Sequence, residues 1–174
     1  MSDERRTLVL LRHAKSDYPA GVGDHERPLA SRGEREAGLA GDWLRQSVTG
    51  PPVQAVLCSS ATRTRQTLER TGLDVPVHYL DRLYGAAPGA IIDEINKVDS
   101  AFDFDVDTLL VVGHEPAMSG LALGLAASEG TNHSAAERVS TKYPTSAMAV
   151  LKFTGPWSSL ELGSAALVTF YVPR

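Results

Sequence analysis

The sequence predicts a single α/β domain in which a mostly parallel central sheet is flanked by helices. Three short runs are almost continuously apolar and rich in Val and Leu, as is typical of parallel strands buried on both faces. These runs are Thr7–Leu11, Val53–Leu57 and Thr108–Val112. Helical patterns lie between them, and this alternation indicates an α/β fold. The 174 residues, 43% of them apolar, suffice for one compact domain that spans residues 1–174.

Four helices and two further strands complete the prediction. Ser31 and Glu34 have the spacing of a capping box, and an apolar stripe then continues to about Val48. The other helices are expected at about 61–70, ending at Gly72, at about 88–98, and from Pro116 onward. Late strands are expected at 147–153 and 165–172, on either side of a Gly155-Pro156 turn. The polar segment Ser128–Thr145 shows no period and predicts a surface loop that could shape a binding site.

The composition argues against several classes of partner. A formal charge of −4 and a pI of about 5.7 disfavour nucleic acid or an anionic membrane surface as the main partner. The charged first six residues do not resemble a secretory signal, and no stretch approaches the length of about 20 apolar residues that spans a bilayer. The single cysteine, Cys58, fits a reducing compartment. We therefore expect a cytoplasmic protein.

Polar residues of similar chemistry follow all three buried runs. Arg12 and His13 follow the first, Arg63 comes shortly after the second, and His114 follows the third. In open α/β sheets, ligands bind outside the carboxyl ends of the strands, so these side chains are expected to share one crevice. Guanidinium groups match phosphate oxygens in a bidentate manner and stay charged. The pattern therefore predicts phosphoryl transfer.

Three ordered motifs resemble those of the histidine phosphatase superfamily. Leu11–Ser16 is similar to its Arg-His-Gly signature, Ser59–Thr67 to its Ser-x-x-x-Arg-x-x-Gln-Thr element, and Val112–Glu115 to the element with the second histidine. The resemblance implies a phosphoglycerate mutase-like fold. The residues after His13, the stretch Asp24–Gly33 and the small size are most similar to the SixA-type phosphohistidine phosphatases.

Each of the four central residues has an expected role. His13, neutral and held at one ring nitrogen, would attack phosphorus with the other and form a phosphohistidine intermediate that water resolves. Arg12 and Arg63 would disfavour protonation of His13 and hold the equatorial phosphate oxygens, to which His114 would donate a further hydrogen bond. These cationic side chains would replace a metal, so no metal and no other cofactor is expected.

The resemblance also suggests an acid for the leaving group. Members of the superfamily often use a glutamate four residues before a glycine, and Asp81 stands four residues before Gly85. Aspartate is one methylene shorter, and Asp81 could instead pair with Arg82. A phosphoramidate such as phosphohistidine would tolerate a weaker or absent acid, because its P–N bond breaks readily.

Several other residues are secondary candidates. Ser16, Arg27 and Glu115 are expected to contact substrate, although Glu115 could equally be a helix-start carboxylate. Asp17, Asp24 and Glu26 lie in the loop after His13 and could border the pocket, but solvated positions are expected for them. Surface positions are expected for the other histidines, His25, His78 and His133, because they lack partners at metal-ligand spacing.

Alternative functions stay open at this point. Cys58–Arg63 is similar to the loop of cysteine phosphatases, but it is one residue short of Cys-x5-Arg and lacks a glycine, so a buried small residue accounts better for Cys58. A binding module without turnover would not need a nucleophile beside the arginines. The substrate could be a phosphohistidine protein, another phosphoprotein, or a small sugar or nucleotide phosphate. The short chain leaves little for a lid beyond Ser128–Thr145, which favours an open pocket and a phosphate on a macromolecule.

Overall fold

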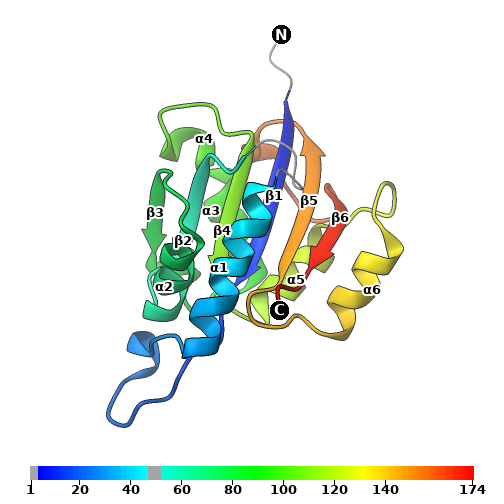
Figure 1. The fold of residues 1–174 in the computed structure, drawn as a ribbon. Coiled ribbons are helices and arrows are strands. Elements are labelled where there is room, and N and C mark those ends of the chain that lie inside the picture. Colours follow the sequence, from blue (N-terminus) through cyan, green and yellow to red (C-terminus); the bar gives the residue numbers. More distant parts are fainter. Residues whose placement is uncertain (1–3, 47–51) are drawn as a thin grey trace.

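A computed structural model describes residues 4–46 and 52–174 and shows an α/β domain built on a six-stranded sheet (Figure 1). The strand order is β3-β2-β4-β1-β5-β6. The strands are β1 (Arg5–Arg12), β2 (Ala55–Ser59), β3 (Val77–Leu80), β4 (Thr108–Gly113), β5 (Met148–Thr154) and β6 (Ala166–Tyr171). The first four run parallel, β5 is antiparallel to β1, and β6 is antiparallel to β5. The predicted mostly parallel sheet is confirmed.

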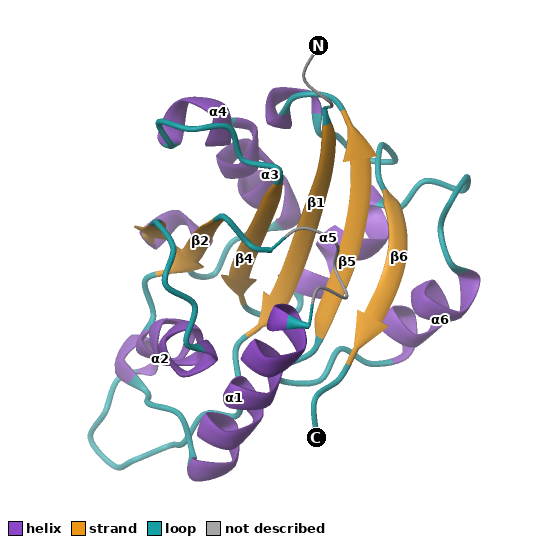
Figure 2. Ribbon diagram, turned by 45° about the horizontal axis from the view of Figure 1, so that its top comes forward, coloured by secondary structure: helices purple, strands orange, loops and turns teal. Residues whose placement is uncertain are grey.

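Helices cover both faces of the sheet (Figure 2). They are α1 (Ser31–Arg45), α2 (Thr62–Thr71), α3 (Pro88–Asn96), α4 (Val98–Ala101), α5 (Ala117–Leu125) and α6 (His133–Thr141). Short 3₁₀ turns are η1 (Asp24–Glu26), η2 (Asp81–Leu83) and η3 (Trp157–Ser159). One hydrophobic cluster joins α1 and α2 to one face, and a larger cluster joins α3 to α6 to the other.

The central strand β1 explains why the sheet is buried on both faces. Leu8 and Leu10 belong to the larger cluster, whereas Val9 and Leu11 belong to the cluster under α1 and α2. All four side chains are fully buried, and each contributes about 1.5–3 kcal/mol by leaving water. This burial fixes the register of β1, and therefore the point at which Arg12 leaves the sheet.

The first helix differs from its prediction at its N-terminus. Ser31 is the first helical residue and Ala30 is the N-cap, without a side-chain capping bond, so the predicted capping box is wrong. The Glu34 amide instead donates to the Ala30 carbonyl. The helix ends at Arg45, and the predicted end near Val48 lies outside the described residues.

Two elements were not predicted. The segment Ser128–Thr145 was expected to be a loop but contains α6, whose N-terminus is capped by the Asn132 side chain accepting from the Ala135 amide. Strand β3 is short and only half-buried, so it lacks the continuous apolar run of its neighbours. The helix predicted at 88–98 is divided into α3 and α4.

Among the described residues, no helix has the length and apolarity needed to cross a membrane.

Candidate active site

The carboxyl ends of three neighbouring strands deliver the predicted residues to one crevice. β1 ends at Arg12, β4 ends one residue before His114, and β2 leads into the first turn of α2, which carries Arg63. The ring centroids of His13 and His114 lie 5.3 Å apart. Both arginines are close enough to lower the pKa of both imidazoles. The structure thus brings these four residues together.

His13 is held as a neutral ring with a defined tautomer. Its Nδ1 lies 2.8 Å from the carbonyl oxygen of Ala14. Because a carbonyl can only accept, Nδ1 carries the proton and Nε2 keeps its lone pair. The pKa of His13 is lowered to about 3, mainly by burial, with smaller contributions from His114, Arg63 and Arg12 and an opposing effect of the Ala14 carbonyl. Burial is therefore a larger cause of neutrality than the arginines that the sequence analysis invoked.

The backbone around His13 is fixed from several sides. The His13 amide donates to the Gly113 carbonyl at 2.9 Å, and the Ala14 amide donates to Thr67 Oγ1 at 2.9 Å. The Ser146 amide donates to the carbonyls of Arg12 (3.1 Å) and His13 (3.2 Å). Ser146 is fully buried and adopts a left-handed conformation with φ of 66°, which is unfavourable for a residue with a Cβ. This strained residue serves to hold the strand end that presents the imidazole.

Arg12 is anchored to the segment after α6. Its Nη1 donates to the Tyr143 carbonyl at 2.8 Å, while its Nε is buried without a hydrogen-bond partner among the described residues. The Tyr143 hydroxyl in turn donates to the Leu10 carbonyl and accepts from the Ala149 amide. A buried tyrosine therefore connects Arg12 to the central strands.

Arg63 is clamped by the loop that follows the nucleophile. Its Nη1 donates to the Asp24 carbonyl oxygen at 2.7 Å and its Nη2 to Asp24 Oδ2 at 3.2 Å. The Tyr84 hydroxyl donates to the same Oδ2, and Arg27 Nε donates to Oδ1 at 3.1 Å. The Arg63 side chain is only 8% exposed, whereas Asp24 is 58% exposed. Asp24, for which a solvated loop position was expected, therefore contacts a residue of the site.

His114 faces His13 from the turn after β4. Its Nε2 lies 2.8 Å from the hydroxyl of Ser59, and its Nδ1 is buried without a partner among the described residues. The pKa of His114 is lowered to about 4, mainly by burial and then by Arg63, while Asp24 opposes the shift. Its ring also packs edge-on against Tyr84. At neutral pH the ring is uncharged, so it can offer a hydrogen bond to an anion but no full positive charge.

Ser16 and Arg27 support the rim and do not join the four central residues. Arg27 Nη1 donates to Ser16 Oγ at 2.7 Å and to the Asp17 carbonyl at 3.2 Å. Its guanidinium also lies 4.1 Å from the ring centroid of Tyr18. Arg27 reaches Arg63 only through the shared carboxylate of Asp24. These contacts describe a residue that orders the loop, and a direct contact with substrate stays a prediction.

The two other carboxylates predicted for the site, Glu115 and Asp81, have different surroundings. Glu115 accepts from both the amide and the hydroxyl of Ser119, at 2.6 and 2.8 Å, as a helix-start carboxylate does. Asp81 is exposed, and its carboxylate forms no hydrogen bond or ion pair with the described residues. Arg82, its suggested partner, instead pairs with Glu94 at 2.8 Å.

The sequence analysis missed several residues that support the site, although they lie within the motifs that it identified. Gln66 accepts from the Leu29 amide and Thr67 from the Ala14 amide, so the Gln-Thr pair ties α2 to the loop on both sides of the site. A Cβ at Gly33 would lie 2.1 Å from the Lys15 carbonyl, which explains why a glycine stands there. His25 bonds Ser60 Oγ at 3.0 Å. Its expected surface position is therefore only partly correct.

Cys58 lies inside the sheet, in β2. It is fully buried, and burial raises the pKa of its thiol to about 12. A thiol of this kind is a poor nucleophile at neutral pH. The structure thus agrees with its interpretation as a buried small residue.

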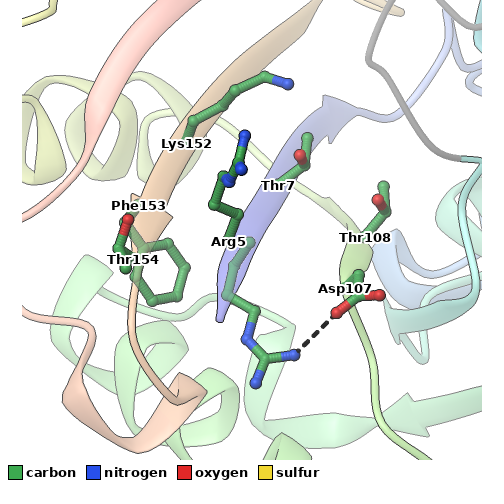
Figure 3. A pocket seen from close by; sticks show the side chains of 8 residues that line it. Arg5, Thr7, Asp107, Thr108, Lys152, Phe153 and Thr154 are labelled. Atoms are coloured by element: carbon green, nitrogen blue, oxygen red, sulfur yellow. Dashed lines mark hydrogen bonds and ion pairs between the residues drawn. The ribbon is translucent and has the colours of Figure 1, made fainter. Parts of the chain in front are cut away.

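A separate cavity of about 460 Å³ lies at the opposite end of the strands (Figure 3). It is lined by Arg5, Arg6, Thr7, Asp107, Thr108, Lys152, Phe153 and Thr154. Arg6 pairs there with Asp105 and Asp107 and donates to the Val106 carbonyl, which fastens β1 to the segment before β4. None of the predicted catalytic residues borders this cavity.

Within residues 4–46 and 52–174, no group of three or more His, Cys, Asp or Glu side chains is placed to hold a metal ion.

Comparisons with known proteins agree with this geometry. A family model described as the histidine phosphatase superfamily (branch 1) matches residues 8–101. An uncharacterized protein of Mycobacterium tuberculosis is 60% identical over 164 residues, which cover 94% of this chain and all of that protein. An uncharacterized protein of Mycobacterium leprae is 52% identical, with the same coverage of both chains.

Solved structures give the same result. A candidate phosphohistidine phosphatase SixA from Nakamurella multipartitia superposes with a TM-score of 0.85 at 37% identity, covering 97% of this chain and 96% of its own. A second candidate SixA, from Agrobacterium tumefaciens, gives a TM-score of 0.75 at 25% identity, covering 97% and 99%. The family match and the two histidines that face each other at the strand ends lead to one conclusion: the chain belongs to the histidine phosphatase superfamily and is a phosphatase of the phosphoglycerate mutase-like fold.

Proposed function

We propose that this protein removes the phosphoryl group from phosphohistidine on a partner protein, through a covalent intermediate on His13. One observation carries the proposal. The His13 ring donates Nδ1–H to the Ala14 carbonyl and is kept neutral by burial, so that Nε2 presents a lone pair in a site that also holds Arg12 and Arg63. A ring prepared in this way is suited to attack phosphorus.

The reaction takes two steps. Nε2 of His13 attacks phosphorus, the new P–N bond forms as the bond to the leaving atom breaks, and the electron pair goes to that atom. Water then attacks the phosphohistidine, and the electron pair of the P–Nε2 bond returns to the ring. Arg12 and Arg63 hold the equatorial oxygens through both steps, and His114 offers a further hydrogen bond.

The carboxylates around the crevice favour a P–N substrate. Asp24 is ionised and bound by Arg63, Arg27 and Tyr84, and the hydrogen bonds from them, that of Tyr84 foremost, lower its pKa to about 2. Glu115 is engaged with Ser119, and Asp81 is exposed without a contact. A substrate whose leaving group needs no proton from the protein suits such a site. Phosphohistidine is a substrate of this kind, because its departing imidazole is stable as a neutral molecule.

Similarity supports the same substrate class. Two solved structures that resemble this chain over nearly its whole length, with TM-scores of 0.85 and 0.75, are candidate phosphohistidine phosphatases. The cytoplasmic location, the absence of metal, nucleic acid and membrane partners, and Asp81 as general acid stay predictions.

A substrate panel tests the proposal. The wild-type protein and His13→Ala are assayed against a histidine-phosphorylated protein, a phosphoserine peptide, a sugar phosphate and a nucleoside monophosphate. We expect the histidine-phosphorylated protein to have the highest kcat/KM and His13→Ala to be inactive on all substrates. A preference for the sugar phosphate or the nucleotide would contradict the proposed substrate, and tight phosphate binding without turnover would contradict an enzymatic role.

A further inference from the structure

Asp24 is the most exposed charged group among those that contact the four central residues. It lies in η1, in the loop between the nucleophile and α1, and two of its partners, Arg63 and Tyr84, are 39 and 60 residues away in sequence. Both terminal nitrogens of Arg63 and the hydroxyl of Tyr84 donate to it, and Arg27 donates to its other oxygen. The carboxylate is therefore held in one place although 58% of the side chain is exposed.

The groups that face Asp24 come from every neighbouring element. They are Arg63 of α2, Tyr84 after η2, Arg27 and His25 of its own loop, and His114 after β4. The ring of Tyr84 packs between His25 and His114, at centroid distances of 4.8 and 5.6 Å. With three donors on its oxygens, Asp24 keeps its negative charge throughout the physiological pH range and offers no proton.

The position of this charge relates it to the leaving group. In an in-line transfer the leaving group departs on the side opposite to the nucleophile. The His13 side chain is 8% exposed, whereas Asp24 is 58% exposed and its carboxylate accepts from Nη2 of Arg63. The electrostatic influence of Asp24 on the site reaches His114, which also faces the nucleophile. Because Asp24 is exposed at the edge of the site, we expect a group that departs toward solvent to leave within the field of its carboxylate.

We propose that Asp24 determines specificity by favouring leaving groups that carry a positive charge or an N–H donor, and by disfavouring anionic leaving groups. This inference rests on the proposed function and adds a selection rule to it. An imidazole that is phosphorylated on one nitrogen and protonated on the other carries such an N–H. When the P–N bond breaks, the electron pair goes to the ring nitrogen and neutral imidazole departs, so no proton is needed from the protein. Asp24 accepts a hydrogen bond from the N–H and keeps the ring in its reactive, protonated form.

Three aryl phosphates separate this role from simple support of Arg63. Phenyl phosphate, 4-carboxyphenyl phosphate and 4-(trimethylammonio)phenyl phosphate have similar shapes but neutral, anionic and cationic leaving groups. For each substrate, kcat/KM of Asp24→Asn is divided by that of the wild type. We expect this ratio to be about tenfold lower for the cationic than for the neutral substrate, and about tenfold higher for the anionic one, as a nearby charge shifts an equilibrium by about one pKa unit or more.

Two further variants serve as controls. Glu26→Gln removes a neighbouring carboxylate that is 67% exposed and, among the residues that the structure describes, pairs with the ring of His25, so its three ratios should be equal. Tyr84→Phe removes one donor but keeps the charge of Asp24, so the substrates should keep their wild-type order. Equal losses, or no losses, on all three substrates in Asp24→Asn would overturn the inference and leave Asp24 as a residue that only positions Arg63.

The pH dependence gives a second measurement. With a histidine-phosphorylated protein as substrate, the alkaline limb of kcat, which reports groups in the enzyme–substrate complex, should move to lower pH by about one unit in Asp24→Asn, because the bound protonated imidazole loses its partner. An unchanged limb would contradict the inference. A wild-type protein that does not hydrolyse phosphohistidine would refute the proposed function instead, and the aryl phosphates would still test Asp24.

Discussion

Replacing His13 with Asn is expected to make the fold less sensitive to acid. The His13 side chain is only 8% exposed, and its pKa falls from 6.5 to about 3 in the folded protein, with burial as the main cause. Between these two values the unfolded chain binds a proton that the folded protein does not. His13 therefore does not lower the stability of the folded state above pH 6.5. Its destabilising effect grows as the pH falls from 6.5 toward 3 and does not grow further below pH 3.

The size of the effect follows from the shift. One pKa unit corresponds to about 1.4 kcal/mol, so at pH 5, about 1.5 units below the ordinary value, His13 destabilises the fold by about 2 kcal/mol. His114, with a pKa lowered to about 4 mainly by burial, adds a similar penalty of about 2 kcal/mol at that pH. Asn at position 13 removes the first penalty and leaves the second.

Urea unfolding at pH 7 and pH 5, followed by circular dichroism, measures this difference. The free energy of unfolding should fall between the two pH values by about 2 kcal/mol less in His13→Asn than in the wild type. His133→Asn, on the exposed start of α6, is the matched control and should behave as the wild type does. The same decrease in His13→Asn and the wild type would refute the claim that His13 is held neutral by burial.

Further substitutions test the remaining parts of the site. Arg63→Lys should lower kcat/KM by about 10²–10³, because a point charge cannot replace the guanidinium fork, while the circular dichroism spectrum stays unchanged; a loss below about threefold would argue against phosphate binding by this residue. Cys58→Ala should leave kcat/KM intact, and a complete loss in a folded variant would revive the cysteine mechanism. Ser146→Val should unfold more easily by about 1–3 kcal/mol and lower kcat, whereas Ser146→Gly, which accepts a left-handed backbone, should not lose stability; equal stability of the two variants would show that position 146 is unstrained. Asp81→Asn should slow alkyl and aryl phosphates equally if the site has no dedicated acid, whereas a selective loss of about 10²–10⁴ on alkyl phosphates would identify Asp81 as the acid.

The central sheet could be predicted because its strands are simple to recognise. β1, β2 and β4 are buried on both faces, so their sequences are nearly continuous apolar runs that end at the functional residues. The convergence of Arg12, His13 and His114 follows from this pattern alone. β3 carries half-buried side chains, and α6 buries only Ala135 and Val139, so neither element leaves a strong periodic signal.

The rim of the site could not be predicted for a different reason. The bonds from Arg63 and Tyr84 to Asp24 cross 39 and 60 residues of sequence, and they depend on how the loop after His13 folds back. The Ser146 amide reaches His13 only because the chain after α6 adopts a left-handed turn there. No spacing within either segment encodes the distance between them.

The covalent step on His13 can be tested most directly by trapping. The protein is mixed briefly with substrate carrying a labelled phosphoryl group, quenched in alkali, which preserves phosphohistidine, and digested for peptide mapping. We expect label on the peptide that contains His13, lost on acid treatment and absent in His13→Ala. Label on Cys58, or turnover without any labelled peptide under conditions that trap a phosphohistidine in a known histidine phosphatase, would contradict it.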